Sequence, residues 1–310
     1  MRLTDFLWRP IRSAPTPDST AASKEVRRLE LKSRRFMDNP ALGPYPSLFR
    51  GHGIEFSEVR EYQPGDPFQA IDWKVTARMR RPYVKRFVEE RELAVLLIVD
   101  VSASHEFGTR KALKRDLVAE VASVLALAAM RAGDPVGMLL FSDRIERYVR
   151  PARGRNRNLR LLHDLVTIQP RGRGTDLDLA LVTAARMLTV RSLVFVISDF
   201  VGSTDLARPL LGLAGRHDVV ALAVDDPAEA TIPESGWVEV VDPETGERAV
   251  VDLGDTTVGE RLTDSSRARD RELETLCARC HVDLMQLRTN VPYESRLAGF
   301  FAARGRRRLR

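Results

Sequence analysis

The pattern of apolar residues along this chain changes at residue 93. From there on, short apolar runs alternate with segments in which apolar residues recur at helical spacing. Runs of this kind, bounded by polar or turn residues, are typical of strands buried on both faces of a sheet. We predict such strands at 93–100, 136–141, 192–198, 219–224 and 282–287.

The segments between these strands predict helices, and two hairpins are also indicated. One hairpin joins 145–149 to the strand before it, and the other spans 237–251 around a Pro-Glu-Thr-Gly turn. Strands that alternate with helices predict an α/β fold, in which helices cover both faces of a mostly parallel sheet. The expected helices are 110–131, 158–167, 176–188, 260–281 and 294–303.

The first 92 residues lack this regular alternation. An amphipathic helix is expected at 23–37, a loop rich in Pro and Gly at 39–53, and an exposed strand at 83–88. We therefore expect the chain to have four parts. They are a flexible leader at 1–22, a small N-terminal α+β subdomain at 23–92, the α/β domain at 93–300 and a basic Arg-rich tail at 301–310.

Positive charge is concentrated at the two ends of the 310-residue chain. The formal net charge is +6, yet residues 1–92 carry +5 and the last ten residues another +5, which leaves −4 for the middle. Basic ends suit nucleic acid, an anionic membrane surface or simple solvation. Aromatic residues are sparse in the basic segments, which counts against stacking on single-stranded nucleic acid.

Composition predicts a globular protein of the cytoplasm. Hydrophobic residues make up 44% of the chain and charged residues 30%. The apolar run at 93–99 is far shorter than the roughly 20 residues of a membrane helix, and the N-terminus has no apolar core of signal-peptide length. Two cysteines cannot build a disulfide scaffold, so a reducing compartment is expected.

Oxygen-bearing side chains gather where three predicted loops begin or end. Asp100, Ser102 and Ser104 follow the first buried strand, Thr175 lies at a helix start, and Asp199 follows another buried strand. Ligands in open α/β sheets bind at the carboxyl ends of the strands. Mg²⁺ prefers about six oxygen ligands, and Mn²⁺ or Ca²⁺ accept similar donors. These five residues therefore predict a divalent cation site.

The neutral hydroxyls in this set have a functional consequence. They leave the ion's charge under-compensated, so a free coordination position would attract an acidic side chain of a partner. In another interpretation, Ser102 and Ser104 cap the following helix or satisfy turn amides.

The set Asp-x-Ser-x-Ser, Thr175 and Asp199 resembles the metal-ion-dependent adhesion site of von Willebrand factor A domains, over roughly residues 93–290. A longer block upstream is similar to the bacterial and archaeal family called domain of unknown function 58, over about residues 23–290. The block comprises 50–56, 60–66, 71–74, 77–78, Val84 and 89–93. We expect Tyr62 and Trp73 of this block to pack the N-terminal subdomain onto the sheet.

This resemblance implies a von Willebrand A-like fold. No catalytic activity is established for the family, so the resemblance does not imply an enzyme. Family members are often encoded beside MoxR-type AAA+ ATPases and are thought to act with them in chaperone-like or metal-insertion assembly. The expected partner is therefore such an ATPase or its protein client, bound through an acidic side chain. His105 departs from the expected pattern, where we would expect Met, and it either packs differently or approaches the ion.

Other motifs carry less weight. Cys277 and Cys280 spell a CxxCH pattern, but they end an amphipathic helix and are interpreted as small core residues rather than haem, zinc or redox ligands. Nucleotide-binding glycine motifs and a G-x-S-x-G nucleophile are absent from the sequence. Two alternatives to a binding module stay open. One is a metal-dependent phosphoester hydrolase or nuclease using Asp100 and Asp199, and the other is a nucleic-acid binder using the basic ends.

Overall fold

The structure is a computed structural model, and it describes most of the chain. The described residues are 19–38, 55–88, 93–106, 108–109, 112–202, 205–230, 236–242, 244–252 and 255–308. The loop expected at 39–53 and most of the leader therefore lie outside the described residues.

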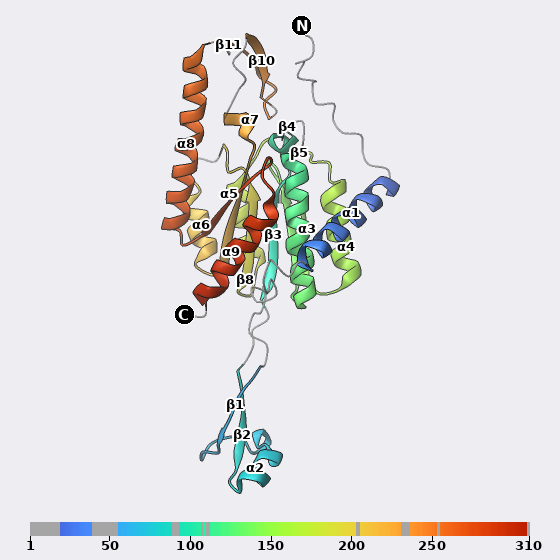
Figure 1. The fold of residues 1–310 in the computed structure, drawn as a ribbon, viewed down its shortest axis with the longest axis vertical. Helices are drawn as coiled ribbons and strands as arrows, with labels where there is room; N and C mark the ends of the chain where they lie inside the picture. The colour runs from blue at the N-terminus through green and yellow to red at the C-terminus, as the bar shows by residue number, and fades with distance from the viewer. Residues whose placement is uncertain are drawn as a thin grey trace.

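A six-stranded sheet forms the centre of the large domain (Figure 1), in the order β12-β9-β8-β3-β6-β7. Neighbours pair in parallel except β7, which is antiparallel to β6 at the edge. The strands coincide closely with the predicted apolar runs. They are β3 (Ala94–Asp100), β6 (Val136–Phe141), β7 (Ile145–Ala152), β8 (Ser192–Ser198), β9 (Asp218–Asp225) and β12 (Asp283–Arg288).

Helices cover both faces of this sheet, and the alternation of side chains along β3 shows how. Val95, Leu97 and Val99 join one buried cluster, whereas Leu96 and Ile98 join the other. The first cluster is closed by α1 (Ser19–Met37), α3 (Lys114–Ala132), α4 (Arg155–Thr167) and α9 (Tyr293–Arg308). The second is closed by α5 (Leu177–Met187), α6 (Ala207–Ala214) and the end of α8 (Thr256–Arg279).

The two cysteines lie in the second cluster. Cys277 and Cys280 are buried and free. Burial raises the pKa of the Cys277 thiol to about 12, so it stays protonated near neutral pH. Their interpretation as core residues is confirmed.

Several element boundaries differ by a few residues from the sequence prediction, and α3 shows one cause. Helix α3 begins at Lys114 rather than at residue 110, because two short strands pair just before it: β4 (Gly108–Thr109) and β5 (Ala112–Leu113). Its end is as predicted, since Gly133 adopts φ 86° there. Helix α6 was not predicted.

Helix α1 packs on the large domain rather than on the rest of the predicted N-terminal subdomain. It lies against α3 and α4. Lys32 Nζ is 2.5 Å from Glu120 Oε2 of α3, and Arg131 is 2.6 Å from Asp38. At the other end, α9 continues through the expected tail to Arg308.

The remaining N-terminal residues form a small group of their own (Figure 1), with β1 (Glu55–Glu61) antiparallel to β2 (Tyr83–Val88), η4 (Phe68–Ala70) and α2 (Trp73–Met79). Asp72 caps α2 by accepting hydrogen bonds from the amides of Lys74 and Val75. The expectation for Trp73 is wrong, because its side chain is 64% exposed. No helix in the described part of the chain is long and apolar enough to span a membrane.

Candidate cation-binding site

Backbone hydrogen bonds bring the predicted loops together at the carboxyl ends of the strands. The amide of Ala103, just after β3, donates to the carbonyl of Arg173 at 3.1 Å. The amide of Asp176 donates to the carbonyl of Ser142, the residue after β6, at 2.8 Å. Asp176 also caps α5 by accepting from the amide of Leu179. Thr175 is therefore held beside the ends of β3 and β6.

Asp100 is the buried centre of this edge. Its Oδ1 accepts a hydrogen bond from the Ser102 amide at 2.9 Å, and its Oδ2 accepts one from the Ser198 hydroxyl at 2.7 Å. Ser198 is the last residue of β8 and is itself fully buried. The two contacts fix the carboxylate between adjacent strands, and they show a positioning role for Ser198 that the sequence analysis did not assign.

The two serines of the Asp-x-Ser-x-Ser motif converge. The Ser102 and Ser104 hydroxyl oxygens are 3.0 Å apart. His105 lies beside them in the short helix η5 (Ala103–Glu106), with its Nδ1 3.6 Å from Asp100 Oδ1 and 3.4–3.5 Å from the two hydroxyls. Its ring is buried. The imidazole therefore packs against the motif.

Asp199 is held by a buried lysine that the sequence analysis did not single out. Lys114, the first residue of α3, is 1% exposed, and its Nζ lies 3.0 Å from Asp199 Oδ2 and 2.5 Å from Glu229 Oε1. The amide of Val201 donates to Asp199 Oδ1 at 3.2 Å. Burial acts to raise the pKa of Asp199, but the nearby charges of His105 and Lys114 outweigh it and lower that pKa.

Lys114 itself stays charged. Burial acts to lower its pKa, but the carboxylates of Asp199 and Glu229 raise it above the ordinary lysine value. The ammonium group thus neutralises part of the negative charge at Asp199. No local pattern in the sequence indicated this, because Lys114 and Asp199 are 85 residues apart.

Thr175 contacts a second unpredicted residue. Its hydroxyl donates to Glu244 Oε1 at 2.8 Å. Glu244 belongs to the turn between β10 (Trp237–Val241) and β11 (Arg248–Asp252), which form the predicted hairpin. Burial raises the pKa of Glu244, and the negative charges of Asp199 and Asp100 raise it further. A third carboxylate therefore lies within electrostatic reach of the predicted site.

The chemistry of these donors fits a hard divalent cation. Among the described residues, no three His, Cys, Asp or Glu side chains cluster in a way that could hold a metal. An ion would therefore depend on the hydroxyls together with single carboxylates. The 3.0 Å between the serine oxygens matches neighbouring ligands of an octahedral Mg²⁺, which lie about 3.0 Å apart when the bonds are about 2.1 Å.

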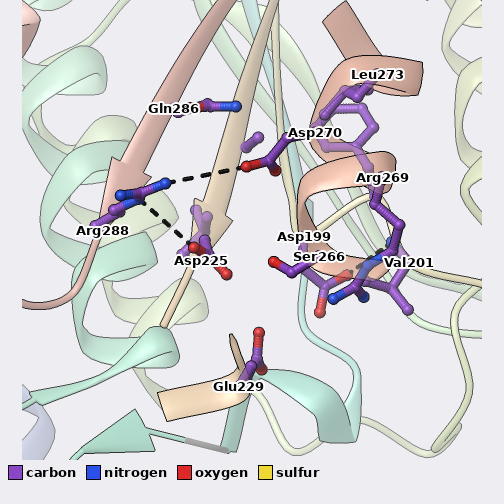
Figure 2. Close-up of a pocket in the computed structure, with 13 residues that line it drawn as sticks. Asp199, Val201, Asp225, Glu229, Ser266, Arg269, Asp270, Leu273, Gln286 and Arg288 are labelled. Atoms are coloured by element: carbon purple, nitrogen blue, oxygen red, sulfur yellow. Dashed lines mark hydrogen bonds and ion pairs between the residues drawn. The ribbon is translucent and has the colours of Figure 1, made fainter. Parts of the chain in front are cut away.

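A pocket of mixed charge adjoins Asp199, lined by β9, β12 and α8 (Figure 2). Arg288 lies between Asp225, at 3.6 Å, and Asp270, at 4.0 Å. Burial raises the pKa of Asp225 and of Glu229. Arg288 and Lys114 offset part of the negative charge of these carboxylates.

The fold has the predicted α/β architecture, with a mostly parallel six-stranded sheet. Two solved structures are similar to parts of it. BatB from Bacteroides thetaiotaomicron is 17% identical, with a TM-score of 0.47 over 69% of this chain and 99% of that one. A von Willebrand factor type A structure from Catenulispora acidiphila is 13% identical, with a TM-score of 0.36 over 70% of this chain and 42% of that one.

The chain belongs to the DUF58 family of proteins of unknown function, whose model matches residues 58–272. It is 31% identical to "Uncharacterized protein Rv1480" of Mycobacterium tuberculosis, over 93% of this chain and 92% of that protein. The same figures hold for "Uncharacterized protein Mb1516" of Mycobacterium bovis. The family prediction is confirmed, whereas the five site residues stay predictions.

Proposed function

We propose that this protein is a non-enzymatic interaction module, which binds an acidic side chain of a partner through a divalent cation. Mg²⁺ is the proposed ion, with Mn²⁺ or Ca²⁺ as possible substitutes. Asp100, Ser102, Ser104, Thr175 and Asp199 would hold it. The convergence of the Ser102 and Ser104 hydroxyls beside the fixed Asp100 carboxylate carries this proposal.

The electrostatics of the site favour a cation that still attracts an anion. Three of the five side chains are neutral hydroxyls, and Lys114 already offsets the charge of Asp199. The five proposed side chains would supply five of the about six oxygen ligands that Mg²⁺ takes, so one position would stay open and a carboxylate would be its natural further ligand. This chemistry suits binding of an acidic residue on another protein better than binding of a basic one.

The proposed partner is a MoxR-type AAA+ ATPase or its protein client, and this rests on the family resemblance rather than on the geometry. Work of this kind would place the protein in the cytoplasm, which stays a prediction. The test is binding between the full chain and a purified ATPase of this type, with Mg²⁺ and with EDTA. We expect EDTA and Asp100→Ala each to weaken binding at least tenfold. Binding that ignores both changes contradicts the metal bridge.

A metal-dependent phosphoester hydrolase is the main alternative, and it is separated from the proposal by turnover. The assay uses p-nitrophenyl phosphate and bis-p-nitrophenyl phosphate with Mg²⁺ or Mn²⁺. Hydrolysis that Asp199→Ala abolishes would replace the proposal of a binding module with that of an enzyme. A nucleic-acid binder would instead show affinity that falls steeply with salt.

A further inference from the structure

We propose that Glu244 is an acidic ligand that the chain itself presents to the cation site, and that a partner's carboxylate must displace it. This inference rests on the proposed function. It adds that Glu244 of the same chain occupies the site until a partner's carboxylate displaces it. The observation behind it is the 2.8 Å hydrogen bond from Thr175, one of the five proposed ligands, to Glu244 Oε1.

Both oxygens of Glu244 lie at the edge of the site. Oε1 accepts a hydrogen bond from Thr175. Oε2 lies near the preceding residue, Gly174, because a Cβ atom added there would be 3.7 Å from Oε2. Burial and the charges of Asp199 and Asp100 both act on this carboxylate. Glu244 thus lies within electrostatic reach of Asp199 and Asp100, and a cation bound at the site would offset the repulsion between these charges.

Hydrogen bonds within the turn that carries Glu244 hold this residue in position. Asp242 Oδ1 accepts from the Glu244 amide at 2.8 Å, and Asp242 Oδ2 accepts from the Thr245 hydroxyl at 2.9 Å. The amide of Gly246, which has φ 75°, donates to the Asp242 carbonyl at 2.8 Å. These hydrogen bonds hold Glu244, Thr245 and Gly246 in place, so little conformational entropy would be lost if Glu244 became a ligand.

The hairpin of β10 and β11 is held weakly enough for Glu244 to move away from the cation site. Within the described residues, strands β10 and β11 pair only with each other and stand outside the six-stranded sheet. Trp237 is 73% exposed and Val250 is 65% exposed, so these large apolar side chains do not bury the hairpin in the core. Segments with few buried apolar contacts open locally at low free-energy cost. Displacement of Glu244 would therefore not require unfolding of the domain.

The test uses Mn²⁺ as the ion and acetate as the competing carboxylate, with the full chain. Mn²⁺ binding is followed by electron paramagnetic resonance, and acetate binding by the change in water-proton relaxation of the Mn²⁺-loaded protein. A tethered carboxylate competes at an effective concentration in the millimolar range. We therefore expect Glu244→Ala and Glu244→Gln to strengthen acetate binding at least about twofold, the factor reached when this effective concentration equals the dissociation constant of acetate. Glu247→Gln, an exposed residue of the same turn, should leave it unchanged.

The outcomes separate this inference from the proposed function. If Asp100→Ala abolishes Mn²⁺ binding and the Glu244 variants alone strengthen acetate binding, the inference is supported. If Mn²⁺ binding depends on Asp100 but acetate binds the wild type and both Glu244 variants equally, the inference is overturned and the cation site stands. Mn²⁺ binding that is absent, or that Asp100→Ala does not affect, overturns both. Thermal melts confirm that each variant is folded.

Discussion

Replacement of Lys114 by Met removes the buried cation beside Asp199 and keeps most of the side-chain volume. Two carboxylates then lose their counter-ion, because Lys114 Nζ lies 3.0 Å from Asp199 and 2.5 Å from Glu229. Removal of one partner from a buried ion pair costs about 3–5 kcal/mol. At about 2–4 °C per kcal/mol for a domain of this size, the melting temperature should fall by about 6–20 °C.

The assay is urea unfolding at neutral pH, and Lys32→Met is the matched control. Lys32 also lies 2.5 Å from a carboxylate, that of Glu120, but its side chain is 40% exposed. Solvent screening limits such a surface pair to about 0–1 kcal/mol. A loss of less than about 1 kcal/mol in Lys114→Met, equal to that of the control, would refute the argument that burial makes this pair important.

The effect of Lys114→Met should also depend on pH. The pKa of Asp199 is lowered in the folded protein, so its contribution to stability is present above the ordinary aspartate pKa and is lost as pH falls through the folded value. The destabilisation by Lys114→Met should therefore be greatest near neutral pH and shrink only as the pH falls below the ordinary aspartate pKa of about 3.9. A difference that grows on acidification would contradict this sign.

Three further predictions follow from buried contacts. Ser198→Ala removes a 2.7 Å hydrogen bond to Asp100 and should cost about 1.5–3 kcal/mol in urea unfolding; an unchanged midpoint would show that the hydroxyl does not hold the carboxylate. Arg304→Ala removes a buried guanidinium group that contacts Asp218 and Asp283 and should lower stability by about 3 kcal/mol, which thermal melts would reveal. The Cys277 thiol, with its pKa raised to about 12 by burial, should not react with Ellman's reagent at pH 8 until denaturant is added; fast reaction of two thiols in the native protein would contradict its burial.

The strands could be predicted from the sequence because they are buried on both faces. Every residue of β3, β6 and β8 is buried, so each appears as a continuous apolar run whatever its neighbours are. Helix α6 was missed because its eight residues include a proline and a glycine, which obscure a helical period. The start of α3 was misplaced because the pairing of β4 with β5 has no apolar signature.

The candidate site was predictable only where it follows strand ends. Asp100 and Asp199 each lie at or just after a buried strand, so topology places them at one edge of the sheet. Lys114, Glu229 and Glu244 reach that edge from other elements of the fold, and nothing in their local sequence sets them apart from other charged residues. Their roles follow from tertiary packing, which a single sequence does not reveal.

The most direct test of the cation site is Mg²⁺ and Mn²⁺ titration of the purified chain by isothermal calorimetry. Wild-type protein should bind one ion of either metal. Asp100→Ala should lose this binding, whereas Asp264→Ala, which removes a carboxylate that is 77% exposed on α8, should retain it. A wild-type protein that binds neither ion, or an Asp100→Ala variant that binds as well as the wild type, would contradict the account.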